Sequence, residues 1–326
     1  MIWPRRSVLR WLALAPIAAC AAGSRGAPEQ RAGSRAAALR ADDPPGDRKT
    51  QRGPMQTRAI PSSGAPLPVV GLGTWQTFDV GADEAERAPL REVLRRFFDG
   101  GGRAIDSSPM YGRAEAVVGD LLRGTPHADA AFLATKVWTT GKPEGEAQIA
   151  ESERRMGGRL DLVEVHNLVD WRTQLATLRS LKDAGRIRYV GVTHWSRGAF
   201  DEIEQILSTE ALDFVQLPYS AATREAEHRL LPLARERGVA VLVMRPFEQG
   251  ELFRRSRGVP LPAAAAELGA ASWAEVFLRF ILAHPAVTAV IPATSNPEHV
   301  SQNLAAGAGP FPDERQKREI LAALGL

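Results

Sequence analysis

Hydrophobic and polar residues change their spacing repeatedly from residue 57 to the end of the chain. Short runs rich in β-branched residues alternate with longer stretches in which apolar residues recur every three or four positions. Period two is typical of strands and period 3.6 of helices, so this alternation predicts repeated strand–helix units. Two short apolar runs, residues 57–60 and 67–70, flank Pro-Ser-Ser-Gly and predict a hairpin that precedes the units.

Eight predicted strands follow one another within about 270 residues. They cover residues 69–72, 103–106, 131–136, 160–166, 188–193, 214–217, 239–244 and 289–291. The predicted helices cover residues 84–99, 114–122, 144–156, 172–184, 198–207, 225–237, 272–283, 297–305 and 313–324. Eight such units predict an α/β fold, a (β/α)8 TIM barrel over residues 57–326. An open doubly wound sheet is the alternative, but Gly71-Leu72-Gly73 lacks the third glycine of a dinucleotide fingerprint.

The N-terminal residues form a different kind of segment. The chain opens with Arg5 and Arg6 before an apolar run over residues 11–19, and Cys20 follows. A basic start, a short apolar core and small residues predict a signal peptide over residues 1–22. The run is too short to span a membrane. The arginine pair resembles a twin-arginine export signal, with an ordinary secretory leader as the alternative.

Cys20 ends the sequence Ile-Ala-Ala-Cys, which also resembles a bacterial lipoprotein cleavage box. A cleavage site that contains a cysteine by chance is the alternative. Residues 23–56 lack Phe, Trp, Tyr, Ile and Val, so they cannot bury enough apolar surface to offset the entropy of ordering, and they predict a disordered linker. We therefore expect export through the leader, to the periplasm or to a membrane tether at Cys20.

Charge is divided between the leader and the barrel. The net charge is +3, but residues 1–56 hold ten Lys/Arg and four Asp/Glu, a balance of +6. The other 270 residues therefore carry 31 Lys/Arg against 34 Asp/Glu, a balance of −3. This balance argues against a basic nucleic-acid-binding surface on the barrel. The single cysteine excludes an intramolecular disulfide.

Four polar residues end or follow three consecutive predicted strands. Asp106 ends the second strand and Tyr111 follows it, Lys136 ends the third, and His166 ends the fourth. Each residue alone has an ordinary structural explanation, such as a turn, the core or an ion pair. Barrel enzymes, however, place catalytic groups at the C-terminal ends of strands, so the ordered set predicts one site at one rim.

This set suits the reduction of a carbonyl group. The oxygen becomes negative when its carbon receives a hydride, and it then needs a proton donor. A nearby ammonium lowers the pKa of a phenol, so we expect Lys136 to lower the pKa of Tyr111 and Asp106 to hold Lys136 charged. His166 is expected to hydrogen-bond the substrate oxygen. The histidines lack paired ligand spacing, and no metal site is predicted.

The motifs that carry these residues resemble those of the aldo/keto reductase family. Residues 71–75 read Gly-Leu-Gly-Thr-Trp, residues 105–112 read Ile-Asp-Ser-Ser-Pro-Met-Tyr-Gly, and residues 134–136 read Ala-Thr-Lys. Residues 161–166, 181–193 and 290–303 continue the match, which covers residues 57–310. The resemblance implies a barrel that uses NADPH without a Rossmann domain. It makes Tyr111 the general acid, tuned by Lys136 and Asp106, while His166 orients the carbonyl.

The resemblance also implies a cofactor site and a substrate mouth. Asn167 and Gln216 match positions that hold the nicotinamide carboxamide, and Asn303 matches an adenine contact. The substrate pocket is expected to contain Trp75, Tyr111, Trp138 and His166. The full expected cofactor set is Gly73, Thr74, Asp106, Asn167, Thr193, His194, Gln216, Met244, Arg245, Pro246, Phe247, Pro292, Ala293, Thr294, His299, Gln302 and Asn303.

Several of these positions depart from the family pattern. Thr193-His194 replaces the usual Ser-Asn, and Met244 replaces an aromatic residue that stacks on nicotinamide. Arg245 is suited to the pyrophosphate, with a rim salt bridge as the alternative. Ala293 and His299 replace the Lys and Arg that bind the 2′-phosphate. NADP remains the first expectation, because His299, Thr294 and Ser295 can still donate to a phosphate, and NAD is the alternative.

The sequence thus predicts an NAD(P)H-dependent oxidoreductase that reduces an aldehyde or a ketone. The alternative is an exported or tethered barrel that binds a cofactor or small ligand without turnover. The intact Asp-Tyr-Lys-His set favours the enzyme, whereas the altered phosphate motif favours the alternative. The partner in either case is a small molecule, and the sequence leaves the oligomeric state undetermined.

Overall fold

The protein is seen in a computed structural model that describes residues 53–326. The predicted signal peptide, Cys20 and all but residues 53–56 of the predicted linker lie outside the described residues. Export, the periplasmic or tethered location and lipidation therefore stay predictions, which fractionation of cells expressing a tagged chain would test. Within residues 53–326, no helix is long and apolar enough to cross a membrane.

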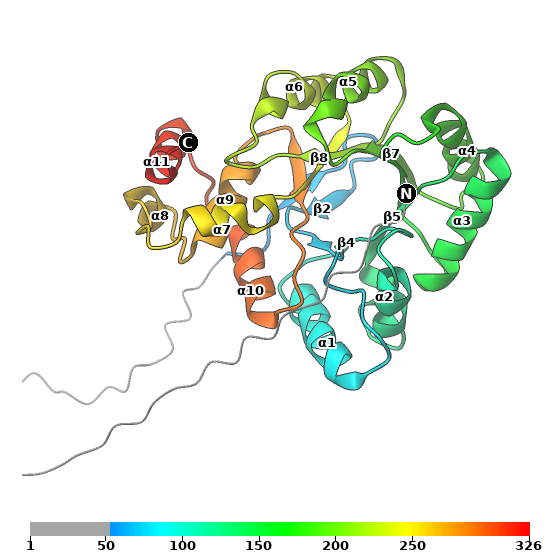
Figure 1. Ribbon diagram of the computed structural model, residues 1–326, viewed down its shortest axis with the longest axis horizontal. Helices are drawn as coiled ribbons and strands as arrows, with labels where there is room; N and C mark the ends of the chain where they lie inside the picture. Colours follow the sequence, from blue (N-terminus) through cyan, green and yellow to red (C-terminus); the bar gives the residue numbers. More distant parts are fainter. Residues whose placement is uncertain (1–52) are drawn as a thin grey trace, which may run out of the picture. The chain divides into compact units, whose positions relative to one another are not determined.

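Eight parallel strands run in chain order through the centre of the fold (Figure 1). They are β3 (Leu72–Gly73), β4 (Ala104–Asp106), β5 (Phe132–Val137), β6 (Leu162–His166), β7 (Tyr189–Thr193), β8 (Phe214–Pro218), β9 (Ala240–Met244) and β10 (Val287–Val290). Parallel bridges between Val70 and Val290 and between Gly73 and Ala293 join the first strand to the last. The predicted arrangement of eight parallel strands is confirmed.

Helices surround these strands in Figure 1. They are α1 (Glu84–Asp99), α2 (Ala114–Leu122), α3 (Lys142–Arg155), α4 (Trp171–Asp183), α5 (Phe200–Thr209), α6 (Leu230–Glu236), α7 (Glu251–Arg255), α8 (Ala263–Glu267), α9 (Trp273–Leu282), α10 (Pro297–Ala306) and α11 (Glu314–Leu324). Side chains cap several N-termini: Asp83 accepts from the amide of Ala85, and Asp313 forms a capping box with Gln316. These caps explain why the predicted starts of α1 and α11 lie within a residue of the observed ones.

The predicted hairpin closes the N-terminal end of the barrel. Its strands β1 (Thr57–Ala59) and β2 (Pro66–Pro68) pair antiparallel. Ile60 and Leu67 are buried and pack with the apolar side chains of the barrel interior. Since this end is sealed by the hairpin, the open end is the one at which the strands finish.

Alternation along the strands separates the barrel interior from the surface that faces the helices. One apolar cluster holds the interior residues Ala104, Phe132, Ala134, Leu162, Tyr189, Phe214, Ala240, Leu242 and Ala289. The residues between them belong to the larger cluster that also contains the helices. Side chains two positions apart point the same way, so the inward row continues to Asp106, Lys136, Glu164, His166, Thr193, Gln216 and Met244.

The structure differs from the sequence expectation in several elements, among them the first strand, which is only Leu72–Gly73 rather than residues 69–72. The predicted helix over residues 225–237 is a 3₁₀ turn followed by α6, which begins only at Leu230. The last strand is Val287–Val290 rather than residues 289–291. Two short helices, α7 and α8, were not predicted, because five residues are too few to show a helical period.

Candidate active site

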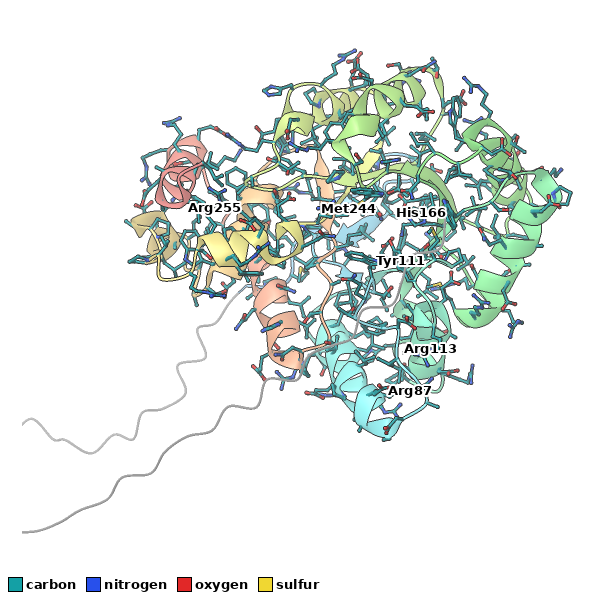
Figure 2. All side chains as sticks on the ribbon, viewed as in Figure 1. Arg87, Tyr111, Arg113, His166, Met244 and Arg255 are labelled. Atoms are coloured by element: carbon teal, nitrogen blue, oxygen red, sulfur yellow. The ribbon has the colours of Figure 1, made fainter. Side chains whose placement is uncertain are left out.

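The strand ends bring the predicted residues to one rim of the barrel. Asp106 ends β4, His166 ends β6, and Lys136 is the penultimate residue of β5. Tyr111 follows β4 in the loop that leads to α2. Figure 2 shows Tyr111, His166 and Met244 close to the centre of the ring of helices. The structure therefore places these side chains close together, as the sequence predicted.

A buried ion pair forms the base of the site. Lys136 Nζ donates to Asp106 Oδ1 and to the carbonyl of Ser107, each at 2.7 Å. The Lys136 side chain is fully buried and that of Asp106 is 6 % exposed. Burial alone would lower the pKa of Lys136, but Asp106, Tyr111 and Glu164 outweigh it and hold that pKa above its usual value. The lysine is therefore charged at every physiological pH.

Side chains at or near the ends of β3, β7 and β8 support this ion pair. Gln216 Nε2 donates to Asp106 Oδ1 at 2.9 Å, and Gln216 Oε1 accepts from Thr193 Oγ1 at 3.2 Å. The hydroxyl of Thr74 donates to the carbonyl of Asp106 at 2.9 Å. Three residues expected to contact cofactor thus hold Asp106 in place within the chain.

Tyr111 lies beside the lysine and the histidine. Lys136 Nζ is 5.3 Å from the centroid of the Tyr111 ring, and the rings of Tyr111 and His166 meet edge to face at 6.1 Å. Lys136 lowers the pKa of Tyr111 as expected, but burial is the larger effect, and burial together with Asp106 and Glu164 raises that pKa overall. The expectation of a net lowering was wrong, because it counted the ammonium without the burial and the carboxyl groups. Tyr111 holds its proton firmly.

The loop that carries Tyr111 is tied to the segment after β3. Asp79 Oδ1 accepts from the backbone and the Nε of Arg113, at 3.0 and 3.1 Å. Gly112 has φ +62°, and a Cβ there would lie 2.4 Å from the Asp79 carboxyl group. Only glycine allows this close approach. The hydrogen bonds from Arg113 to Asp79 and the close approach at Gly112 therefore fix the backbone next to Tyr111.

His166 is a neutral group at the rim. Its Nδ1 lies 3.1 Å from Ser108 Oγ. Burial, helped by the charge of Lys136 and by His194, lowers the pKa of His166 to about 3. An uncharged imidazole whose Nδ1 is occupied by Ser108 leaves Nε2 for a substrate oxygen.

Large apolar side chains lie exposed around this rim. Trp75 and Trp138, both expected in the substrate pocket, are 42 % and 41 % exposed, and Met110 is 40 % exposed. They come from the ends of β3 and β5 and from the loop before Tyr111. Exposed aromatic groups next to a buried polar cluster are typical of a ligand mouth.

A polar pocket of about 540 Å³ opens after β7, β8 and β9. Arg245 lines it, with its guanidinium 5.6 Å from the ring centroid of Trp195 and 3.9 Å from a carboxylate oxygen of Glu248. Arg245 Nε is buried without a hydrogen-bond partner among residues 53–326. The rim salt bridge considered as an alternative is thus present but long, and it leaves a donor unused.

The remaining expected cofactor residues lie in three places. His194 follows β7. Met244 ends β9, and Pro246 and Phe247 come after it, where Phe247 packs against Phe253 with ring centroids 4.8 Å apart. Gly73 donates its amide to the carbonyl of Pro292, next to Ala293. Thr294, His299, Gln302 and Asn303 lie at or on α10, where Asn303 is buried and His299 and Gln302 are exposed.

Comparison with known proteins assigns the family. Residues 69–318 match the sequence profile of the aldo/keto reductase family. The chain belongs to that family. The methylglyoxal reductase YeaE of Escherichia coli (strain K12) is 31% identical over 262 residues, which cover 77% of this chain and 89% of that protein. The NADH-specific methylglyoxal reductase of the same strain is 28% identical over 220 residues, covering 56% and 64%.

Solved structures agree with this assignment. An aldo-keto reductase from Klebsiella pneumoniae in complex with NADPH is 26% identical, with a TM-score of 0.68 over 82% of this chain and 94% of that chain. An aldo/keto reductase from Klebsiella pneumoniae in complex with NADP and acetate is 28% identical, with a TM-score of 0.66 over 80% and 91%. The resemblance seen in the sequence motifs is confirmed at the level of the family.

Sequence reasoning missed two residues of this reductase's site. Ser108 contacts the imidazole of His166, and the only signal for it was its place in the Ser-Ser-Pro segment after β4. Glu164 faces the barrel interior two residues before His166, and an acid at an inward position of a strand was the signal for it. The sequence shows that a serine and a glutamate occupy these positions. It does not show their contacts, because these depend on the register between strands.

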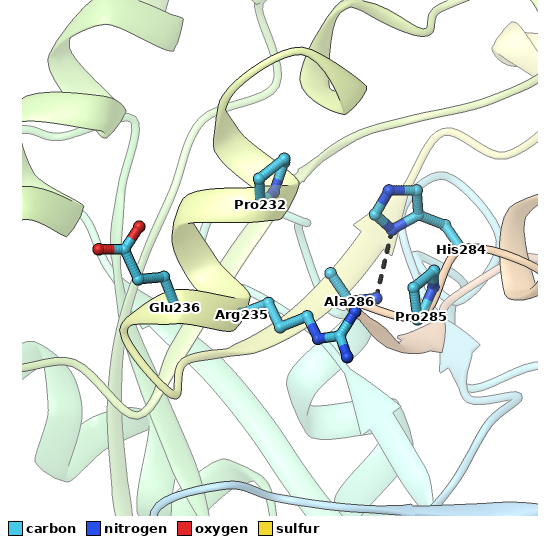
Figure 3. A pocket seen from close by; sticks show the side chains of 6 residues that line it. All are labelled: Pro232, Arg235, Glu236, His284, Pro285 and Ala286. Carbon is cyan, nitrogen blue, oxygen red and sulfur yellow. Dashed lines mark hydrogen bonds between the residues drawn. The ribbon is translucent and has the colours of Figure 1, made fainter.

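A second groove lies at the opposite end of the barrel (Figure 3). It has a volume of about 470 Å³ and lies between α6 and the segment that leads into β10. His284 accepts from the amide of Ala286 at 3.2 Å, and burial lowers the pKa of its imidazole. The groove lies before the start of β10 and is lined by none of the predicted site residues.

Proposed function

We propose that this reductase converts an aldehyde or a ketone to an alcohol, with a hydride from a nicotinamide cofactor and a proton from Tyr111. The observation that carries the proposal is the buried pair of Lys136 and Asp106 beside Tyr111, at the rim that also holds a neutral His166. Its relatives include two proteins named as methylglyoxal reductases, which act on a carbonyl substrate.

Tyr111, His166 and Lys136 have separate roles in proton transfer. Tyr111 holds the proton that neutralises the substrate oxygen, and its raised pKa keeps that proton in place until the oxygen becomes negative. His166, with Nδ1 bonded to Ser108, donates from Nε2 to the same oxygen and fixes its angle. Lys136 stabilises the phenolate left on Tyr111 after transfer, and Asp106 keeps the ammonium in position.

Two buried polar atoms fit a nicotinamide cofactor. Asn167 Oδ1, next to His166, has no hydrogen-bond partner among the described residues and is an acceptor suited to a carboxamide N–H. Arg245 Nε is a free donor in the 540 Å³ pocket and is suited to a phosphate oxygen. When bound, NADPH or NADH supplies the hydride. Asn167 would hold its nicotinamide carboxamide and Arg245 its pyrophosphate.

The choice between the two cofactors depends on α10. Solved relatives hold NADPH or NADP, whereas one relative is named NADH-specific. Here Ala293 and His299 provide no permanent cation for a 2′-phosphate. We propose that the reductase accepts NADP, with NAD as a second cofactor of similar affinity.

Cofactor titration by tryptophan fluorescence tests this proposal. The variant Ala293→Lys/His299→Arg restores two cations, and it is expected to bind NADPH at least about tenfold more tightly, the effect of a charge-assisted hydrogen bond. NADH lacks the phosphate and serves as the control, since its affinity should not change. An equal gain for both cofactors would contradict a phosphate site at α10, and no binding of either would contradict the proposed function.

A further inference from the structure

Glu164 is a buried acid that the proposed proton transfer does not use. It lies on β6, two residues before His166, and therefore points into the barrel one layer below the rim. Its side chain is fully buried, and neither carboxyl oxygen has a hydrogen-bond partner among residues 53–326. A buried polar group without a partner destabilises a fold. The position of Glu164 therefore points to a role beyond packing.

Neighbouring strands leave room for this side chain. On β7, Gly191 pairs in register with Glu164. A Cβ at Gly191 would lie 3.1 Å from Glu164 Cγ and 2.7 Å from the carbonyl oxygen of Phe214. A larger residue at 191 would therefore displace Glu164 or β8. On the other side, the register partner of Glu164 is Lys136 of β5.

The ammonium group of Lys136 lies near two carboxyl groups, those of Asp106 and Glu164. Lys136 of β5 and Asp106 of β4 are the charged groups that act on Glu164. His166, above it on β6, is neutral. On β7, Gly191 has no side chain and Tyr189 directs its hydroxyl to Ser63 of the hairpin, while β8 contributes Phe214. Tyr111 completes the set, since it interacts with Lys136, Asp106 and Glu164.

The two carboxyl groups differ in the hydrogen bonds that they accept. Asp106 accepts from Lys136 at 2.7 Å and from Gln216 at 2.9 Å, whereas Glu164 accepts from neither. Burial and the charge of Asp106 raise the pKa of Glu164 well above its usual value, although Lys136 opposes them. Two hydrogen bonds therefore support the negative charge of Asp106, whereas burial favours the protonated form of Glu164.

We propose that Glu164 is a positioning residue that keeps the proton on Tyr111 and thereby favours carbonyl reduction over alcohol oxidation. This inference rests on the proposed role of Tyr111 as the proton donor. Ionisation of Glu164 adds a carboxylate in register with Lys136. The new carboxylate then shares the charge of Lys136 and opposes a further negative charge on the phenol. A protonated Tyr111 serves reduction, in which it gives a proton, and hinders oxidation, in which it must accept one.

The electrostatics of Tyr111 agree with this role. Burial raises the pKa of Tyr111 most, and both Asp106 and Glu164 raise it further. Asp106 also holds Lys136, whereas Glu164 accepts no hydrogen bond from the described part of the chain that its removal would break. Replacing Glu164 therefore changes the charge near Tyr111 without dismantling the ion pair.

Tyrosinate absorbance tests the proposal without cofactor or turnover. The chain has three tyrosines, Tyr111, Tyr189 and Tyr219. The difference between pH titrations of a protein and of its Tyr111→Phe counterpart isolates Tyr111. In Glu164→Gln we expect the ionisation constant of Tyr111 to rise roughly tenfold, which moves its midpoint to lower pH. Glu164→Leu removes the same carboxyl group and gives the same shift if the glutamine variant folds poorly.

A buried glutamate outside the barrel interior provides the control. Glu115 on α2 is 1 % exposed and accepts from Thr135 Oγ1 at 2.6 Å. Glu115→Gln should leave the Tyr111 midpoint in place. An unchanged midpoint in both Glu164 variants, or the same shift in the Glu115 variant, overturns the proposal. The role of Tyr111 as proton donor would survive that result, because it is tested separately by the activity of Tyr111→Phe.

Steady-state kinetics provide a second readout. In Glu164→Gln the alkaline limb of carbonyl reduction and the acid limb of alcohol oxidation should both move to lower pH, because both report the ionisation of Tyr111. A residue with only a structural role would change stability and leave both limbs where they are. Limbs that stay in place in a stable variant contradict the proposal.

Discussion

Tyr111→Phe is expected to lower kcat/KM for carbonyl reduction by at least about two orders of magnitude, the usual contribution of a general acid. The change removes the hydroxyl group and keeps the ring that packs against His166 and lies beside Lys136. Cofactor affinity should therefore be retained. The measurement is the initial rate of cofactor oxidation with an aromatic aldehyde or methylglyoxal, together with cofactor titration of both proteins.

Tyr189→Phe is the matched control for this substitution. Tyr189 is also a buried tyrosine of the barrel interior, but its hydroxyl bonds Ser63 at the hairpin end, 2.8 Å away. Its loss should affect stability and leave turnover unchanged. Equal rates for the wild type and Tyr111→Phe would show that the proton comes from another group.

Asp106→Asn is expected to destabilise the protein by about 3–5 kcal/mol, because it leaves Lys136 charged and unpaired in a fully buried position. Lys136→Met should be similarly destabilising, since it leaves Asp106 without its cation. Both variants should also lose activity, because Tyr111 loses the ammonium or its support. Denaturant unfolding at neutral pH measures the stability difference.

The double variant Asp106→Asn/Lys136→Met separates the two effects. It contains neither charge, so it should regain much of the stability lost by either single variant while remaining inactive. Losses that simply add in the double variant would show that the two charges do not stabilise each other. Recovery of activity with stability would contradict a chemical role for the pair.

The rim of the site could be predicted because the hydrophobic pattern shows the order of the strands and roughly where each strand ends. Asp106, Lys136 and His166 lie at or next to the ends of three consecutive strands, and parallel strands of a barrel finish at the same end. No distance was needed for that conclusion. The N-terminal hairpin and the long helices followed from the same change in hydrophobic period.

Contacts between strands could not be predicted in the same way. The bond of Ser108 to His166 and the position of Glu164 over Gly191 depend on register, which the period of a single strand does not specify. The net direction of the Tyr111 pKa was wrong for a related reason. It is a balance of burial against three charged groups, and the sequence revealed only the nearest partner, Lys136.

Gln216 and Thr193 illustrate a further limit. The resemblance placed both among the cofactor contacts, yet in the structure they bond each other and, through Gln216, Asp106. A motif specifies which residue occupies a position, while the partners of that residue depend on the whole rim. Asn167, by contrast, keeps a buried acceptor that has no hydrogen-bond partner among residues 53–326, where the motif predicted a carboxamide contact.

Transfer of a deuterium label tests the central claim most directly. The reductase is incubated with an aromatic aldehyde and with NADPH or NADH that carries deuterium at the transferable position of the nicotinamide, and the alcohol is analysed by mass spectrometry. The account predicts one deuterium on the carbinol carbon, with the yield strongly reduced in Tyr111→Phe. Cofactor binding without any labelled alcohol would contradict it and would favour a barrel that binds its ligand without turnover.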